Sequence, residues 1–167
     1  MKLTIYRLLS FLLAPIAVLF SISALLLIGT ALSNPAMLFP LFLIICIAIY
    51  SFASLHFLIK GIDGSKYLGK SSKDWLKVNA YACIIFILII ISEFVVFMLH
   101  PEILQQIITQ AKQNADTSLT INENDFQGFA SKILYILLAY ALVLSAHVLM
   151  SFQYIKQYGY LFQNKNK

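Results

Sequence analysis

Residues 78–99 read VNAYACIIFILIIISEFVVFML, a run of 22 residues with one charged side chain, Glu93. An α-helix rises 1.5 Å per residue, so about 20 such residues cross a hydrocarbon core that is ~30 Å thick. Three more apolar runs of similar length lie at residues 8–32, 36–59 and 133–154. None of the four alternates strictly between apolar and polar residues, as the strands of a membrane barrel do. The sequence therefore predicts an all-α fold, an integral membrane four-helix bundle that forms one domain over residues 1–167.

The composition of the whole chain supports a membrane protein. The 167 residues are 60% hydrophobic and 11% charged, whereas a soluble domain is about 45–50% apolar and about 25% charged. So few charges cannot cover a surface that faces water, which disfavours a soluble enzyme, a disordered chain and a disulfide-stapled secreted module. The run at residues 8–32 is longer than the apolar part of a signal peptide, so we expect it to remain as a helix.

The basic residues lie mainly on one side of the predicted membrane. Ten of them are Lys2, Arg7, Lys60, Lys66, Lys70, Lys73, Lys77, Lys156, Lys165 and Lys167, while the other side holds only Lys112 and Lys132. Short cytoplasmic loops are enriched in Lys and Arg. We therefore predict a cell-membrane protein with both termini and the 60–77 connection in the cytoplasm. The Lys- and Asn-rich polar segments suit a bacterial inner membrane.

The same lysines do not predict a nucleic-acid partner, because they lie at the ends of the spans without interleaved aromatic residues. They favour a weak attraction to anionic lipid, of about 1 kcal/mol for each lysine near the surface. Residues 64–71, GSKYLGKS, match the expression of a phosphate-binding loop. That loop needs a buried strand before it and an α/β core around it. A predicted membrane helix precedes it here, so we interpret the match as chance.

The segment between the third and fourth spans is the longest connection. Residues 101–113 place their apolar side chains on one helical face, which predicts a short amphipathic helix on the outer side. Thr120 and Glu123 have the spacing of a capping box, so we expect the fourth helix to begin near Ile121.

The first span carries small residues at heptad spacing. The stripe consists of Ser10, Ala14, Ala17, Ser21, Ala24 and Ala31, with Ile28 in the same line. Small residues let helix backbones approach closely in lipid. The stripe either seats this span inside its own bundle or forms a dimer face.

The third span carries most of its polar residues on one line, which includes Asn79, Glu93 and His100, while Ser92 lies beside this line. Glu93 lies six residues, or ~9 Å, inside the end at Leu99. A charge at membrane depth costs on the order of 2.5 kcal/mol or more, so this line should face protein or water. Two interpretations stay open: Glu93 pairs with Lys132 or Tyr135, or it serves ion or proton movement.

The fourth span places Tyr140 and His147 on one face, and His56 lies near the inner end of the second span at a comparable depth. The two histidines could meet, but zinc takes three or four ligands, so we predict neither a metal nor a cofactor. The polar candidates within or beside the spans are Glu93, Asn79, His100, Tyr135, Tyr140, His147 and His56.

No arrangement of catalytic residues is recognisable, so we expect no enzyme activity. The sequence favours a non-catalytic accessory, scaffold or regulatory module that packs against a membrane-protein partner or a second copy of itself. A small oligomeric transporter or channel that uses Glu93 is the alternative. A lipid-modifying enzyme that uses His147 and His56 is the weakest hypothesis.

Overall fold

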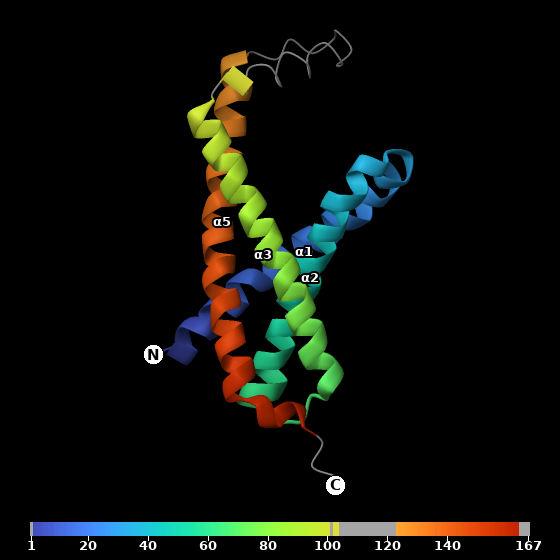
Figure 1. Ribbon diagram of the computed structural model, residues 1–167, viewed down its shortest axis with the longest axis vertical. Helices are drawn as coiled ribbons and strands as arrows, with labels where there is room; N and C mark the ends of the chain where they lie inside the picture. The colour runs from blue at the N-terminus through green and yellow to red at the C-terminus, as the bar shows by residue number, and fades with distance from the viewer. Residues whose placement is uncertain (1, 101, 104–122, 164–167) are drawn as a thin grey trace. The chain divides into compact units, whose positions relative to one another are not determined.

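The computed structural model describes residues 2–100, 102–103 and 123–163. Within these ranges its regular secondary structure consists only of helices, which turns and short connections join. They are α1 (Lys2–Ser33), the short helix η1 (Pro35–Met37), α2 (Leu38–His56), the π-helix η2 (Phe57–Asp63), α3 (Lys70–Leu99), α5 (Glu123–Gln157) and the 3₁₀-helix η3 (Gly159–Phe162) (Figure 1). The predicted amphipathic helix and Thr120 lie outside the described residues, apart from Glu102 and Ile103.

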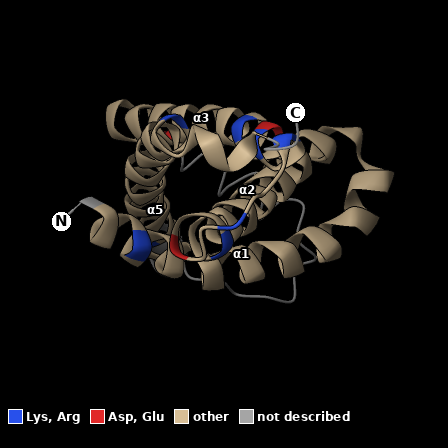
Figure 2. Ribbon diagram, turned by 90° about the horizontal axis from the view of Figure 1, so that it is seen from below, with Lys and Arg blue, Asp and Glu red and all other residues tan. Residues whose placement is uncertain are grey.

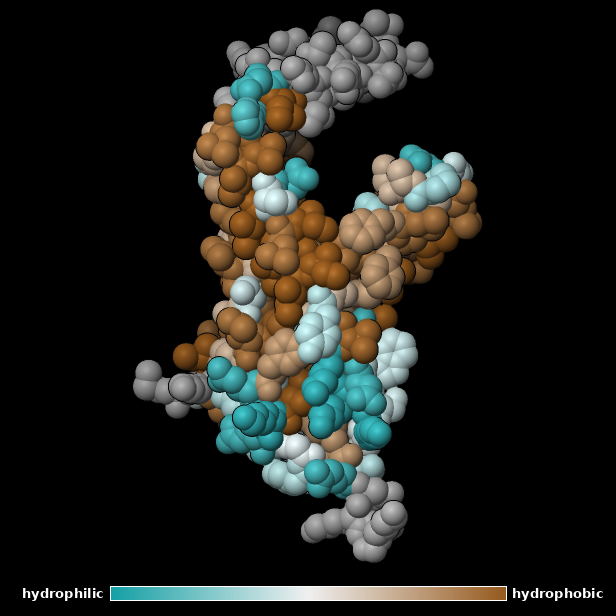
Figure 3. Space-filling view, in the orientation of Figure 1, coloured by the Kyte–Doolittle hydropathy of each residue, from teal (hydrophilic) through white to brown (hydrophobic). Residues whose placement is uncertain are grey.

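Four helical segments are long and apolar enough to cross a membrane: Leu3–Ser33, Pro35–Asp63, Lys70–Leu99 and Gly128–Gln157. Many of their large apolar side chains point outward; Leu26 and Leu32 are 76% and 79% exposed. Brown apolar residues accordingly cover most of the helical surface in Figure 3, and hydrophilic residues gather near the C-terminal end. An outward apolar surface is stable only in lipid or against another protein. For the described residues, the prediction of a helical fold with four helices long and apolar enough to span a membrane is confirmed.

A tight turn joins α1 to α2. The backbone amide of Asn34 donates to the carbonyl of Thr30 at 2.9 Å, and the side-chain oxygen of Asn34 accepts from the amide of Ala36 at 3.1 Å. Pro35 then begins η1, where its missing N–H leaves no helical bond unmade. The two helices therefore form an antiparallel hairpin. Near its turn the small residues Ala24 and Ala31 pack against Leu41.

The connection from α2 to α3 is folded back against both ends of the chain. Arg7 forms an ion pair with Asp63 at the end of η2. The amide of Leu68 donates to the carbonyl of Leu161 in η3 at 3.0 Å. The start of α1, the connection and η3 therefore lie next to one another. Figure 2 shows the Lys and Arg residues of the described helices and connections in blue.

Two glycines shape this connection. A Cβ atom on Gly61 would lie 2.7 Å from Cδ1 of Leu68, so only glycine lets Leu68 pack this closely on η2. Gly69 has φ +80°, a conformation that glycine adopts without strain, and α3 begins at the next residue.

The chain divides into two compact units. Unit 1 comprises Met1–Phe86 with Val143–Lys167, and unit 2 comprises Ile87–Leu142. Helices α3 and α5 each contribute to both units.

Candidate functional site

Five buried polar side chains of unit 1 form one cluster, which we call the His147 network. Its members are Tyr6 and Ser10 of α1, Tyr50 of α2, and His147 and Ser151 of α5, and each is at most 1% exposed. The hydroxyl of Tyr50 lies 2.8 Å from Nδ1 of His147 and 2.8 Å from Oγ of Ser151. Oγ of Ser10 lies 2.9 Å from Nε2 of His147, and Oγ of Ser151 lies 3.2 Å from the hydroxyl of Tyr6.

The hydrogen bonds of Ser10 determine which ring nitrogen of His147 carries the proton. Ser10 donates its only hydroxyl proton to the backbone carbonyl of Tyr6 at 2.8 Å, so its oxygen must accept from Nε2–H of His147. A neutral imidazole with its proton on Nε2 then accepts at Nδ1 from the hydroxyl of Tyr50. Both ring nitrogens are satisfied without a charge.

The aromatic rings close the cluster to water. The ring of Tyr6 stacks on the imidazole of His147 with centroids 4.8 Å apart and planes 9° apart. The ring of Tyr50 meets the same imidazole edge-on at 5.6 Å. A serine that is hydrogen-bonded to a histidine, which is in turn oriented by a further hydroxyl, has the pattern of an activated nucleophile. Here Ser10 and His147 are buried, and the proton of Ser10 is already committed to a carbonyl, so this arrangement serves helix packing.

The small-residue stripe is part of the same packing surface. Ser10, Ala17, Ala24 and Ala31, each seven residues apart, are buried at 6% exposure or less. Ala14 and Ser21 are half-buried, and Ser21 donates to the carbonyl of Ala17 at 2.8 Å. The buried positions therefore lie on the side of α1 that contacts the rest of unit 1.

Glu93 has a different environment, in unit 2. Its side chain is exposed and lines a hollow of about 170 Å³, together with Val96 and Phe97 of α3, His100 just after α3, and Leu134 of α5. The ion pairs formed among the described residues are Arg7 with Asp63 and His100 with Glu102. Glu93 takes part in neither, so the structure does not show the predicted ion pair with Lys132.

The remaining candidates from the sequence lie apart from one another. Tyr135 packs edge-on against Phe94, with ring centroids 5.6 Å apart, rather than bonding to Glu93. Asn79 is buried and donates to the carbonyl of Trp75 at 2.8 Å, within its own helix. Tyr140 is buried in unit 2. His100 is exposed, and its Nδ1 lies 2.9 Å from a carboxylate oxygen of Glu102.

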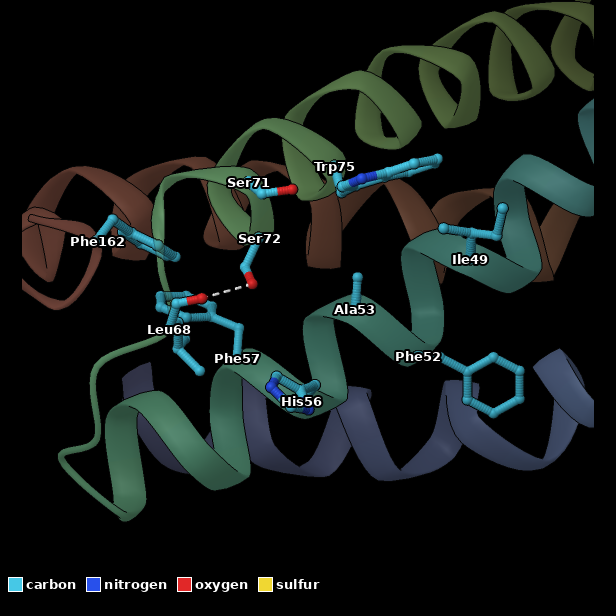
Figure 4. Close-up of a pocket in the computed structure, with 10 residues that line it drawn as sticks. All are labelled: Ile49, Phe52, Ala53, His56, Phe57, Leu68, Ser71, Ser72, Trp75 and Phe162. Carbon is cyan, nitrogen blue, oxygen red and sulfur yellow. Dashed lines mark hydrogen bonds between the residues drawn. The ribbon is translucent and has the colours of Figure 1, made fainter.

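The two histidines that could meet by their depth in the spans have separate surroundings. His147 is enclosed by the network, and His56 is exposed on the wall of a groove between α2 and α3. This groove, which we call the α2–α3 groove, has a volume of about 430 Å³. Figure 4 shows Phe52, Ala53 and His56 on its α2 side, and Ser71 and Trp75 on its α3 side.

Reasoning from the sequence missed Tyr6 and Tyr50. The available signal was polar residues one helical turn apart in otherwise apolar spans: Tyr6 with Ser10, and His147 with Ser151. That spacing places each pair on one helix face, but it does not indicate that the faces meet across three helices.

No family model, no curated protein and no solved structure matches this chain. Its function is therefore argued from the geometry alone.

Proposed function

We propose that this chain is a non-catalytic accessory subunit of a membrane complex, and that a partner protein covers the face of α3 that carries Glu93. The proposal includes the orientation argued from the lysines, with both termini in the cytoplasm of a bacterial cell, and it takes the chain as one four-helix bundle in the inner membrane.

The exposed position of Glu93 carries the proposal. By count along the helix, the carboxyl lies ~9 Å inside the end of α3, and its immediate neighbours in the hollow, Val96 and Phe97, are apolar. An ionised carboxyl facing lipid at that depth is strongly unfavourable. A hydrogen-bond donor or a cation from a partner helix would remove this cost, because helices in lipid associate through such polar contacts.

The buried network supports the same proposal from the other unit. Its polar groups satisfy one another and hold α1, α2 and α5 together, so they offer no group that a substrate could reach. The carboxyl of Glu93 on α3 is then a group that binds a partner, rather than part of a reactive centre.

Co-purification from native membranes in lipid nanodiscs tests the proposal. We expect one partner protein at a fixed ratio to this chain, and loss of that partner in Glu93→Leu. Glu102→Leu is the matched control, because this exposed acid lies beyond the end of α3, and it should retain the partner. If Glu93→Leu retained the partner as fully as Glu102→Leu, Glu93 would not be the contact.

A second candidate function is a small oligomeric transporter or channel, which the hollow lined by both Glu93 and His100 favours. Proton or cation flux into vesicles that contain only this chain distinguishes the two. A flux that Glu93→Gln abolishes in folded protein supports the transporter, and a flux equal to that of empty vesicles supports the accessory subunit.

A further inference from the structure

The α2–α3 groove has the size and composition of a ligand site. Its volume of about 430 Å³ lies within the range of small-molecule pockets. Its walls are mostly apolar: Phe52 and Ala53 come from α2, and Trp75 comes from α3. Phe52 and Trp75 are 42% and 57% exposed, so they are open to an occupant. An apolar groove in a membrane protein fits the hydrocarbon chain of a lipid.

One end of the groove is polar and is flanked by lysines. His56 of α2 and Ser71 of α3 both line it (Figure 4). Lys60 follows His56 by four residues, and Lys70 directly precedes Ser71. The neighbouring Ser72 does not contribute a free hydroxyl, because its Oγ donates to the carbonyl of Leu68 at 2.7 Å.

The charge of this end is strongly positive. Residues 56–77 contain five lysines against two acids, Asp63 and Asp74. Asp63 is already paired with Arg7. The charge balance around the groove therefore selects an anionic headgroup over a zwitterionic one.

The geometry points to a binding site for one anionic phospholipid, whose acyl chain lies along Phe52, Ala53 and Trp75 and whose phosphate lies between His56, Ser71, Lys60 and Lys70. The lipid comes from the leaflet at the lysine-rich end, which is the cytoplasmic leaflet in the proposed orientation. This site does not depend on the partner at Glu93, which belongs to the other unit.

The chain contains a built-in reporter for this site. Trp75 is its only tryptophan, and it lines the groove. Vesicles that contain phosphatidylglycerol or phosphatidylcholine with brominated acyl chains quench tryptophan fluorescence only on contact. Both leaflets of such vesicles have the same composition, so the result is independent of orientation.

We expect brominated phosphatidylglycerol to quench Trp75 at a mole fraction at least about tenfold lower than brominated phosphatidylcholine. Each lysine near the surface strengthens binding to anionic lipid about fivefold. The double variant Lys60→Gln/Lys70→Gln should therefore lose on the order of tenfold of that preference. The control Lys66→Gln/Lys156→Gln removes the same charge at exposed positions that adjoin neither His56 nor Ser71 along the chain, and it should keep most of the preference.

A third variant tests the apolar part of the site. Ala53→Leu fills the groove without changing the charge, and it should raise the mole fraction of phosphatidylglycerol needed for half-maximal quenching severalfold. Equal quenching by the two lipids in the natural chain would overturn the proposal. So would an equal loss in the two double variants, which would show general attraction to the basic surface, or an unchanged response in Ala53→Leu.

Discussion

At the scale of single residues, burial and hydrogen bonding decide what each polar side chain does. His147 is a member of a closed network, and Glu93 is exposed in a hollow, although both lie within apolar helices. The sequence identifies both as unusual, because polar residues are rare in membrane spans. It does not distinguish them, because the distinction depends on which side chains other helices bring to them.

Removal of one hydroxyl from the network should destabilise unit 1. Tyr50→Phe leaves Nδ1 of His147 without its donor and leaves Ser151 with only its longer contact to Tyr6. We expect the free energy of unfolding in detergent micelles to fall by about 1–2 kcal/mol. Tyr81→Phe is the control, since Tyr81 is 59% exposed, and it should change stability little. Equal values for the two variants would mean that the network contributes nothing.

The carboxyl of Glu102 should titrate below the ordinary pKa of a glutamate. A hydrogen bond from its own backbone amide, followed by one from the side chain of His100, lowers the pKa of this carboxyl below its ordinary value of 4.5. The stability that it contributes is therefore present above the ordinary pKa and is lost as the pH falls through the lowered pKa. A carbon-13 NMR titration measures the midpoint. His100→Ala should raise it only in part, because the backbone bond remains; a midpoint at the ordinary value in the natural chain would contradict this.

At the scale of helices, much of the structure can be predicted from hydropathy and spacing. The four apolar runs locate the four helices that are long and apolar enough to span a membrane, since length and composition alone determine whether a helix can span. Three of the helices, α1, α3 and α5, begin earlier than their apolar runs; α3 starts at Lys70, eight residues before Val78. Polar residues at the membrane surface can continue a helix as well as apolar ones do, so hydropathy marks the span and not the helix end.

The heptad spacing of small residues on α1 also predicts a packing surface, because this spacing places the small residues on one face of the helix. The partner helices are not encoded in that spacing, because the faces of α2 and α5 have no comparable pattern. The phosphate-loop match at residues 64–71 is the opposite case, in which a sequence pattern is present without the structure that it needs. The described residues around it include no strand, and helix η2 comes before it.

A larger side chain in the stripe should destabilise the protein. Ala17 is fully buried on α1, so Ala17→Leu forces overpacking, and we expect unfolding to become easier by about 1–3 kcal/mol. Val18→Leu is the matched control, because Val18 is the next residue and is 47% exposed. Equal stability of Ala17→Leu and Val18→Leu in the same unfolding assay would show that the stripe tolerates bulk and does not set the packing.

At the scale of the whole molecule, the contacts of Arg7 with Asp63 and of Leu68 with Leu161 bring the start of α1, the connection and the C-terminal helix together. The distribution of lysines predicts that this end faces the cytoplasm. The side of the membrane on which this end lies depends on how the chain inserts into the membrane, and not on contacts within the chain.

Labelling of introduced cysteines tests on which side of the membrane each connection lies. Cys46 and Cys83 are buried and free, so they should give little background. Met37→Cys, in the turn between α1 and α2, should react with an impermeant maleimide on intact cells. Ser65→Cys, in the connection from α2 to α3, should react only after the cells are opened. The reverse pattern would invert the proposed orientation.

The central claim is that a partner covers the face of α3 that carries Glu93, and site-specific photo-crosslinking in living cells tests it most directly. Val96 lines the hollow with Glu93, whereas Val95 lies at the same depth on the other side of the helix and is 47% exposed. With p-benzoylphenylalanine in place of Val96 we expect one protein adduct of defined mass, and in place of Val95 we expect adducts with lipid only. An adduct of Val96 with a second copy of the chain would favour the oligomeric transporter, and lipid adducts alone from both positions would contradict the claim.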